Sequence, residues 1–449
     1  MKKEVTHDMT RGPILQPLIS FTVPLILGNF LQLTYNAADS MIAGRFIGKE
    51  ALASIGTSNP LMTMILLFTN GICLGAGILV SFQFGAGKHD TLKRQVSTGM
   101  CAGIVFSLLV GALIALCAYP IMTLLRTDTA IRQMAAGYLR IIMTGLVFSF
   151  IYNYLASMLR SMGDSKSPLI FLAISALLNI GGDLLFVVAL RMGITGAALS
   201  TVICEALSAA LCWFYVYRRI PLLRLGKSWL TVDGFLLKKT LSYGVVSALQ
   251  QSSVQLGKLI VQGFVNSLGV SSTAAFNAVN RTDDIAIVPE QNIAHAMSSA
   301  MAQNVGAHKE DRVKKIFHYG IWLEMGFGIL IGAVLYIFAG PIMRLFTKDA
   351  DVIKMGVGYL RLIAFMYPLP AFTNALQGYF RGIGDMKITL ISSLTSMAVR
   401  ILCCWILTLR GGFRFEILPW TYFAGWTAMT VFELPYLVYL QRKKKGMPQ

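Results

Sequence analysis

Nearly uninterrupted apolar runs of about 20 residues recur along the whole chain, and they limit its possible folds more than any other feature. Three examples are residues 19–38, 141–159 and 320–340. Since an α-helix rises about 1.5 Å per residue, each run can cross the hydrocarbon core of a bilayer. Charged residues make up only 13% of the chain, about half of what a soluble protein carries. The sequence therefore predicts an all-α polytopic membrane protein.

Twelve transmembrane helices follow from the spacing of these runs, with short connections between them. We place the spans near residues 14–38, 55–83, 96–119, 133–158, 168–190, 196–217, 238–265, 274–302, 317–340, 355–378, 388–409 and 419–440. An even number of spans returns the chain to the side on which it began, so both termini are expected on one side of the membrane.

The basic residues are distributed unequally between the two sides. The chain has a net charge of +18, and 24 of its 39 Lys and Arg residues fall on the side of the termini. Twelve fall on the other side, and Lys258, Arg281 and Arg400 lie deep within spans. Because basic loops stay in the cytoplasm, this bias places both termini there and predicts a protein of the cytoplasmic membrane. The positive charge thus reflects topology, and we expect no nucleic-acid partner.

The chain also contains an internal duplication. Residues 120–140 resemble residues 341–361, RSMGDSKS at 160–167 resembles RGIGDMKI at 381–388, and residues 84–94 resemble 305–315, all at the same offset of 221 residues. We therefore expect an N-lobe (1–217, helices 1–6), a cytoplasmic linker (218–234) and a C-lobe (235–449, helices 7–12). Two lobes of the same orientation are related by a pseudo-two-fold axis along the membrane normal. A site between such lobes can open alternately to each side, which favours transport.

Two aspartates lie within predicted spans of the N-lobe, each with an oxygen ligand four residues away on the same helical face. Tyr35 precedes Asp39 on the first helix, and Asn179 precedes Asp183 on the fifth. Thr201 on the sixth helix adds a hydroxyl. Intramembrane carboxylates usually face the protein interior and serve function, and oxygen ligands suit a proton or a hard cation. We predict a coupling-cation site for H⁺ or Na⁺ and no other metal.

These residues carry a family resemblance. Pro24 followed by Tyr35 and Asp39, the N-x-x-x-D of LLNIGGDLLF, Thr201 in GAALSTV and the paired R-x-x-G-D loops resemble the multidrug and toxic compound extrusion (MATE) family of the MOP flippase superfamily. The resemblance implies a cation-coupled antiporter that exports organic, often cationic or amphipathic, compounds by alternating access. It implies that the five site residues bind the coupling ion. Pro24 removes a backbone hydrogen bond and is expected to act as a hinge.

The C-lobe departs from one branch of that family. A sodium-coupled branch has acids in helices seven and ten, whereas the matching stretches here contain no carboxylate and helix seven carries Lys258. Helix eight is rich in charge, and two interpretations stay open. The first is a set of structural ion pairs among Lys258, Arg281 and Asp283. The second is a polar wall of the substrate chamber, for which the candidates are Gln32, Asn36, Gln251, Gln255, Asn280, Asp284 and Glu290.

Other functions fit the sequence less well. The G-x-G-D of an intramembrane protease occurs at residues 382–385, but in a short loop between basic residues. No nucleotide-binding loop or metalloprotease motif is present, so we expect neither an enzyme nor an ATP-driven pump, and no cofactor. A flippase for a lipid-linked saccharide or another lipid is the alternative function. It would need a cationic cavity, whereas the N-lobe cavity is expected to be acidic. We expect the protein to act as a monomer in the bilayer.

Overall fold

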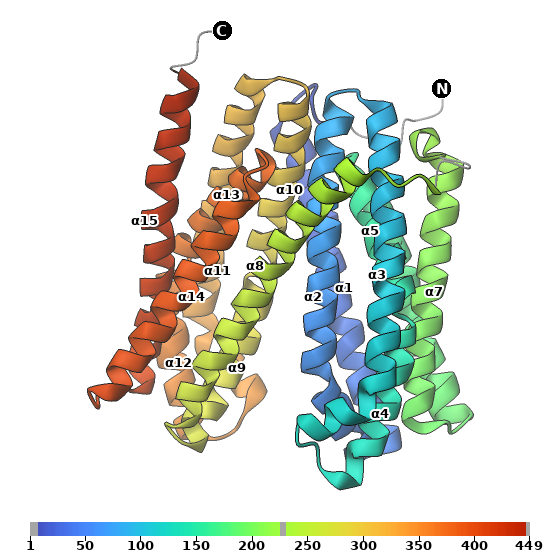
Figure 1. The fold of residues 1–449 in the computed structure, drawn as a ribbon. Coiled ribbons are helices and arrows are strands. Elements are labelled where there is room, and N and C mark those ends of the chain that lie inside the picture. The colour runs from blue at the N-terminus through green and yellow to red at the C-terminus, as the bar shows by residue number, and fades with distance from the viewer. Residues whose placement is uncertain (1–7, 225–229, 446–449) are drawn as a thin grey trace. The chain divides into compact units, whose positions relative to one another are not determined.

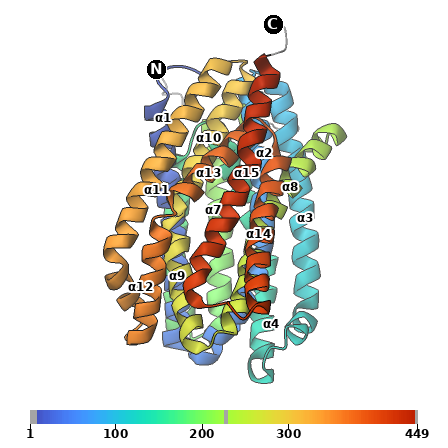
Figure 2. The ribbon, with the colours of Figure 1, turned by 90° about the vertical axis from the view of Figure 1, so that its left-hand side faces the viewer.

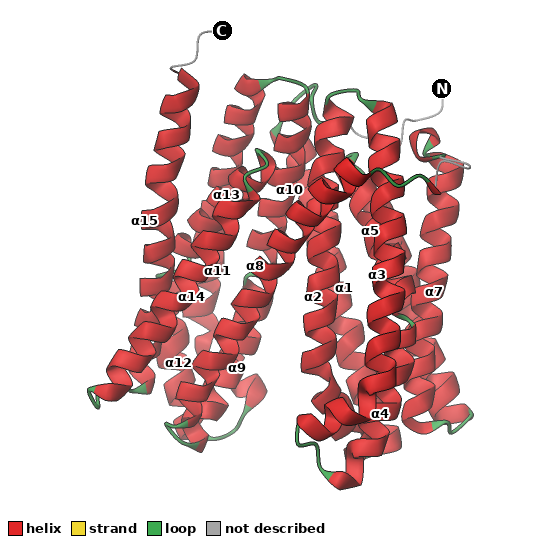
Figure 3. Ribbon diagram, in the orientation of Figure 1, coloured by secondary structure: helices red, strands yellow, loops and turns green. Residues whose placement is uncertain are grey.

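The computed structural model describes residues 8–224 and 230–445, which form helices and loops without any strand (Figure 3). Nine spans are built on one long helix each: α1 (Leu15–Ile42), α2 (Lys49–Gly85), α3 (His89–Leu124), α6 (Lys166–Asp183), α7 (Gly193–Arg219), α8 (Gly234–Asn266), α11 (Glu310–Phe346), α14 (Met386–Leu409) and α15 (Leu418–Lys445) (Figure 1). Three spans are broken into two helices: α4 (Thr129–Thr144) with α5 (Leu146–Ser161), α9 (Val270–Ala286) with α10 (Val288–Gly306), and α12 (Ala350–Ala364) with α13 (Pro368–Gly382). Within the described residues, the predicted all-α fold with twelve spans is confirmed.

Apolar length alone would not have identified all twelve spans in the described part of the chain. Seven helices are long and apolar enough to cross a membrane, or nine spans when the bent pairs α4–α5 (44°) and α12–α13 (53°) are included. The three that fall short are α8, α9–α10 and α15. Helix α8 contains Lys258, and α9 contains Arg281 with two aspartates. These polar spans must therefore be shielded from lipid on part of their surface.

The chain divides into two compact units whose boundary lies within α8. Unit 1 comprises Met1–Ala248 together with Gln303–His308, and unit 2 comprises Leu249–Ala302 together with Lys309–Gln449. The lobe limits expected from the sequence, 217 and 235, lie at the end of α7 and the start of α8. Part of the predicted linker, residues 225–229, lies outside the described residues. The functional division into lobes therefore stays a prediction.

Unit 1 is held together by close contacts between helices that small residues permit. Helix α2 runs alongside α3 and α5 (Figure 1). Ser157 and Ser161 of α5 donate hydrogen bonds to backbone carbonyls of α2, at Cys73 (2.8 Å) and Gly77 (2.7 Å). A Cβ atom at Gly103 of α3 would overlap the ring of Phe150. Association in a membrane depends on such packing and on polar contacts between helices.

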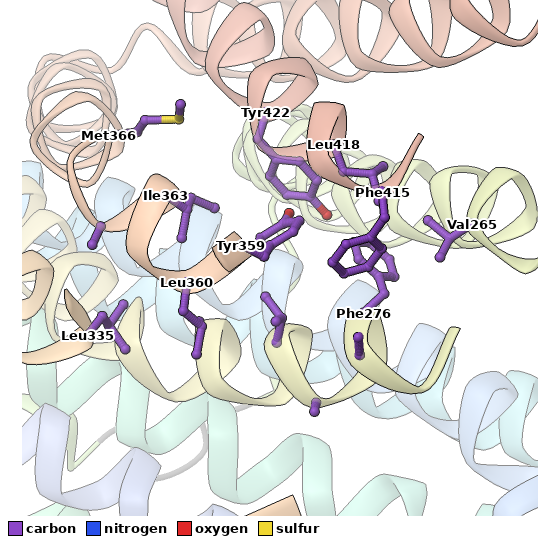
Figure 4. Close-up of a cluster of buried hydrophobic side chains, with 14 of the residues drawn as sticks. Val265, Phe276, Leu335, Tyr359, Leu360, Ile363, Met366, Phe415, Leu418 and Tyr422 are labelled. Carbon is purple, nitrogen blue, oxygen red and sulfur yellow. The ribbon is translucent and has the colours of Figure 1, made fainter. Parts of the chain in front are cut away.

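Unit 2 has its own apolar core, formed by α8, α9, α11, α12, α14 and α15. Figure 4 shows aromatic side chains at its centre, where Tyr359 of α12 lies among Phe276, Phe415 and Tyr422. In Figure 2, α14 and α15 run side by side on the side of this unit that faces the viewer. The core fixes α9 against α12, and this contact places the charged residues of α9.

Helix α6 packs on both α1 and α7 in unit 1, and these three helices carry the predicted cation ligands. Two of them change geometry just after a site residue. Helix α1 continues as a π-helix over Ala43–Ile47, beyond Asp39, and α6 continues as one over Leu184–Ala189, beyond Asp183. The Leu190 N–H, for example, donates to the Leu185 carbonyl across five residues. Such π segments are uncommon and often lie at functional sites.

Candidate cation-coupling site

Asp183 lies at the end of α6 in the interior of unit 1. Its side chain is 1% exposed, and neither carboxylate oxygen has a hydrogen-bond partner among the described residues. The ionisable group with which Asp183 interacts directly is another carboxylate, that of Asp39 on α1. Two adjacent carboxylates repel each other, and burial removes the water that would weaken the repulsion. The pair therefore needs a shared proton or a bound cation.

Asn179 connects the two helices that carry these acids. It is buried one turn before Asp183, on the same face of α6. With its amide nitrogen toward α1, Nδ2 lies 2.8 Å from Asp39 Oδ1 and 3.3 Å from Oδ2. An amide presents either a nitrogen or an oxygen when it turns over, so this side chain can donate to a carboxylate or coordinate a cation. The sequence spacing and the tertiary contact thus bring Asp39, Asn179 and Asp183 together.

The hydroxyl nearest to this cluster comes from Ser200 of α7, which sequence reasoning missed. Ser200 is fully buried, and its Oγ donates to the Asn179 carbonyl at 3.1 Å and lies 3.4 Å from the side-chain amide. Thr201, the predicted ligand, instead donates to the Ala197 carbonyl of its own helix at 3.1 Å. The only sequence signal for Ser200 was its position beside Thr201. Adjacent residues differ by about 100° around a helix, and packing decides which one faces α6.

A third acid lies near the pair. Glu205 is one turn beyond Thr201 on α7, and Ser149 of α5 donates to its Oε1 at 2.9 Å. Tyr35 interacts electrostatically with both Glu205 and Asp39. The structure thus places Glu205 inside unit 1, with a serine as partner.

The other predicted residues of α1 lie along the same helix. Pro24 is a buried residue within α1, where it removes one backbone hydrogen bond. Gln32 and Asn36 are exposed, and the Gln32 side chain interacts with the Tyr35 hydroxyl. These positions leave Gln32 and Asn36 accessible and Pro24 about four turns before Asp39. The hinge and chamber roles stay predictions.

In unit 2, the charges of α9 have separate partners. Lys258 Nζ of α8 lies 2.6 Å from Asp284 Oδ1, with the side chains 23% and 56% exposed. Asp283 is buried and accepts a hydrogen bond from the Tyr367 hydroxyl at 2.5 Å. Arg281 is exposed and has neither an ion pair nor a hydrogen bond among the described residues. Thus the ion pair in this region joins Lys258 to Asp284.

The remaining chamber candidates of unit 2 differ in accessibility. Gln255 is exposed, Gln251 and Asn280 are half-buried, and Glu290 is fully buried. The Asn374 amide of α13 donates to Glu290 Oε2 at 3.3 Å. Complete burial places Glu290 away from any surface that a substrate could touch in this conformation. Gln255 is exposed, as a residue that contacts substrate must be, and it remains a candidate chamber residue.

Unit 2 also contains a deeper group of acids, at Glu290, Glu324 and Glu433. Glu324 is 0% exposed, and neither of its oxygens has a hydrogen-bond partner among the described residues. Its charged neighbours are Glu290 and Arg381. Glu433 is also fully buried and accepts a hydrogen bond from Ser392 at 2.6 Å. The structure therefore places Glu324 and Glu433 in the interior.

Comparison with known proteins identifies the family. The MatE family model matches residues 24–185 and again residues 247–406. The chain belongs to the MATE family. The two matched segments correspond to the two halves of the duplication and cover more than half of the sequence. The resemblance inferred from the motifs is thereby confirmed, and the protein is a transporter that needs no cofactor rather than an enzyme.

Two curated relatives from Bacillus subtilis illustrate the similarity. The probable multidrug resistance protein YpnP is 30% identical over 397 residues, which cover 88% of this chain and 88% of that protein. The probable multidrug resistance protein YoeA is 28% identical over 412 residues, 90% of this chain and 89% of that protein. A solved MATE structure in the bent conformation matches 99% of both chains with a TM-score of 0.90 and 21% identity. This MATE protein thus shares the fold of solved MATE transporters.

Proposed function

We propose that this MATE transporter is a cation-coupled antiporter that exports organic compounds across the cytoplasmic membrane. One observation supports this most: the buried carboxylate of Asp183 lies against the carboxylate of Asp39, and neither group forms an ion pair among the described residues. Two such groups are costly unless a proton or a cation joins them. Asn179, Tyr35 and Ser200 complete the proposed coupling site, in which H⁺ and Na⁺ are the candidate ions.

Loading of the site from outside neutralises the two aspartates and removes their repulsion. Helix α1 then changes its packing against α6 and α7, and Pro24 provides the position at which it can bend. The bent state holds substrate less well, so that ion entry drives substrate release. Because coupling free energy is reciprocal, bound substrate must weaken ion binding by the same factor. The antagonism therefore operates in both directions.

The proposal includes an orientation and an assembly state. Both termini lie in the cytoplasm, as the distribution of Lys and Arg predicts, and the protein acts as a monomer. The N-lobe carries the coupling ion, and the polar residues of α8 and α9 form part of the substrate path. A cationic or amphipathic substrate suits the acidic interior of the N-lobe.

The experiment measures efflux in everted membrane vesicles under an imposed pH gradient or an imposed Na⁺ gradient. We expect wild-type protein to respond to at least one gradient. Asp183→Asn should abolish this response without loss of folded protein, because the amide keeps the size of the acid and cannot change charge. Asn179→Ala should impair Na⁺ coupling more than H⁺ coupling, since a proton needs no second oxygen ligand.

Full transport by the Asp183→Asn protein would contradict the proposal and leave this aspartate a structural role. A second assay separates export from lipid flipping. Wild-type cells should expel a cationic dye, and reconstituted protein should fail to flip a labelled lipid-linked sugar. The opposite result would favour the flippase alternative.

A further inference from the structure

Helices α8 and α9 of unit 2 each carry a polar stripe at helical spacing. On α8 the stripe comprises Gln251, Gln255, Lys258, Gln262 and Asn266, which recur every three or four residues. On α9 it comprises Asn277, Arg281 and Asp284, all of them exposed. The two stripes are connected by the ion pair of Lys258 with Asp284 and by a hydrogen bond from Thr273 to Asn266 (3.4 Å). They form one polar surface, which we call the α8–α9 surface.

This surface cannot face lipid. Arg281 lies 11 residues after the start of α9 at Val270, which corresponds to about 16 Å along the helix. An exposed guanidinium at that depth is costly in hydrocarbon, and so are the amides beside it. By contrast, the exposed residues of α11 include Ile329, Leu330 and Ile337, as a lipid-facing surface requires. The α8–α9 surface therefore borders water or a bound molecule.

Of the three cations near this surface, two have partners. Lys258 is paired with Asp284 at 2.6 Å. Arg400 is buried against the rings of Tyr422 and Trp426, 4.0 Å and 5.1 Å from their centroids, and interacts with Asp283. Asp283 also accepts a hydrogen bond from Tyr367 and lies near the buried Glu290. Arg281 is the most exposed of the three cations and forms no ion pair among the described residues.

We propose that Arg281 is an anion-recognition residue of the substrate path, which favours an organic compound with a carboxylate over the matching ester. This inference rests on the proposed export function and adds to it a residue that determines specificity. A guanidinium offers two parallel N–H donors that match a carboxylate, whereas a simple organic cation gains nothing from it.

Lys258 has a secondary role in this arrangement. Its ammonium group is half-buried and held by Asp284, so that it contributes little charge to the surface. Removal of the Asp284 carboxylate would free this ammonium group and add a second cation one helix away from Arg281. The preference for a substrate with a carboxylate should therefore fall when Arg281 is neutralised and rise when Asp284 is neutralised.

The test compares two dyes that differ only in the acidic group. Rhodamine 110 carries a free carboxylate at neutral pH, and rhodamine 123 is its methyl ester, a plain cation. Gradient-dependent uptake of each dye is measured in everted vesicles, and the readout is the ratio of kcat/KM for the acid to that for the ester. The ratio for Arg281→Gln should fall about tenfold, equivalent to about 1.4 kcal/mol. Arg281→Lys should retain part of the preference, and Asp284→Asn should raise it.

Arg361→Gln is the matched control. This residue is an exposed arginine of α12, 5.6 Å from the centroid of the Tyr336 ring and outside the α8–α9 surface, so its loss should leave the ratio unchanged. Elution as a monodisperse peak in detergent shows that each variant is folded. A ratio for folded Arg281→Gln within about twofold of wild type would overturn the inference while rhodamine 123 export upholds the proposed function. Transport of neither dye by wild type would overturn both.

Discussion

Two adjacent glycines before Asp183 allow a sharp test of the site geometry. A Cβ atom added at Gly182 would lie 2.5 Å from Ser200 Oγ, whereas a Cβ atom at Gly181 meets nothing within 4 Å. Both substitutions to alanine gain the same intrinsic helix propensity, about 0.5–1 kcal/mol. This gain cancels when the two variants are compared. The difference between them therefore reports the contact with Ser200.

The magnitude follows from how the clash can be relieved. Ser200 can rotate its hydroxyl away, which forfeits the hydrogen bond to the Asn179 carbonyl at a cost of about 1 kcal/mol. Alternatively α6 and α7 can separate, and overpacking of this kind costs about 1–3 kcal/mol. We expect Gly182→Ala to be less stable than Gly181→Ala by about 1–3 kcal/mol. Either response displaces the hydroxyl from Asn179, so coupled transport should also fall.

The assay combines thermal unfolding in detergent with gradient-driven dye uptake in vesicles. A double variant separates packing from function. Ser200→Ala in the Gly182→Ala background removes the atom at 2.5 Å and leaves Ser200 Cβ at 3.4 Å, an almost normal contact. Stability should recover, whereas transport should stay low because the hydroxyl is absent. Equal stability and equal transport in Gly181→Ala and Gly182→Ala would refute the arrangement of Ser200 against α6.

Three further predictions test other parts of the molecule. Lys258→Met should lower the free energy of unfolding by about 1 kcal/mol, and Asp284→Asn in the same chain should restore much of it, because no unpaired acid then remains. Thermal melts of the single and double variants measure this, and additive effects of the two substitutions would rule out the ion pair. Cysteine introduced at Lys166 should react with a membrane-impermeant reagent only in everted vesicles, and cysteine at Lys49 only in intact cells; labelling from the other side would invert the proposed topology. Calorimetry should show that a saturating dye weakens binding of the coupling ion by the same factor as the ion weakens dye binding, and unequal factors would contradict a simple antagonism.

Much of the fold was predictable from the chain because its signals are local or repeated. Apolar length identifies nine of the spans, and the duplication at an offset of 221 residues divides the twelve into two sets of six. The same logic placed Asn179 and Asp183 on one face of α6, since residues four apart on a helix are neighbours. The breaks at Gly145 and near Pro368 were not predicted, because both halves of each span remain apolar.

Partners between helices were decided by the tertiary structure alone. The sequence offered Asp283 as the acid of an ion pair with Lys258, and the rotation of α9 against α8 selects Asp284 instead. It offered Thr201 as the hydroxyl of the site, and the rotation of α7 presents Ser200 instead. A helix fixes the relative directions of its own side chains, but its rotation about its axis depends on the packing of every neighbour. The sequence by itself therefore determined which residues share a face, and only the tertiary structure determined what that face meets.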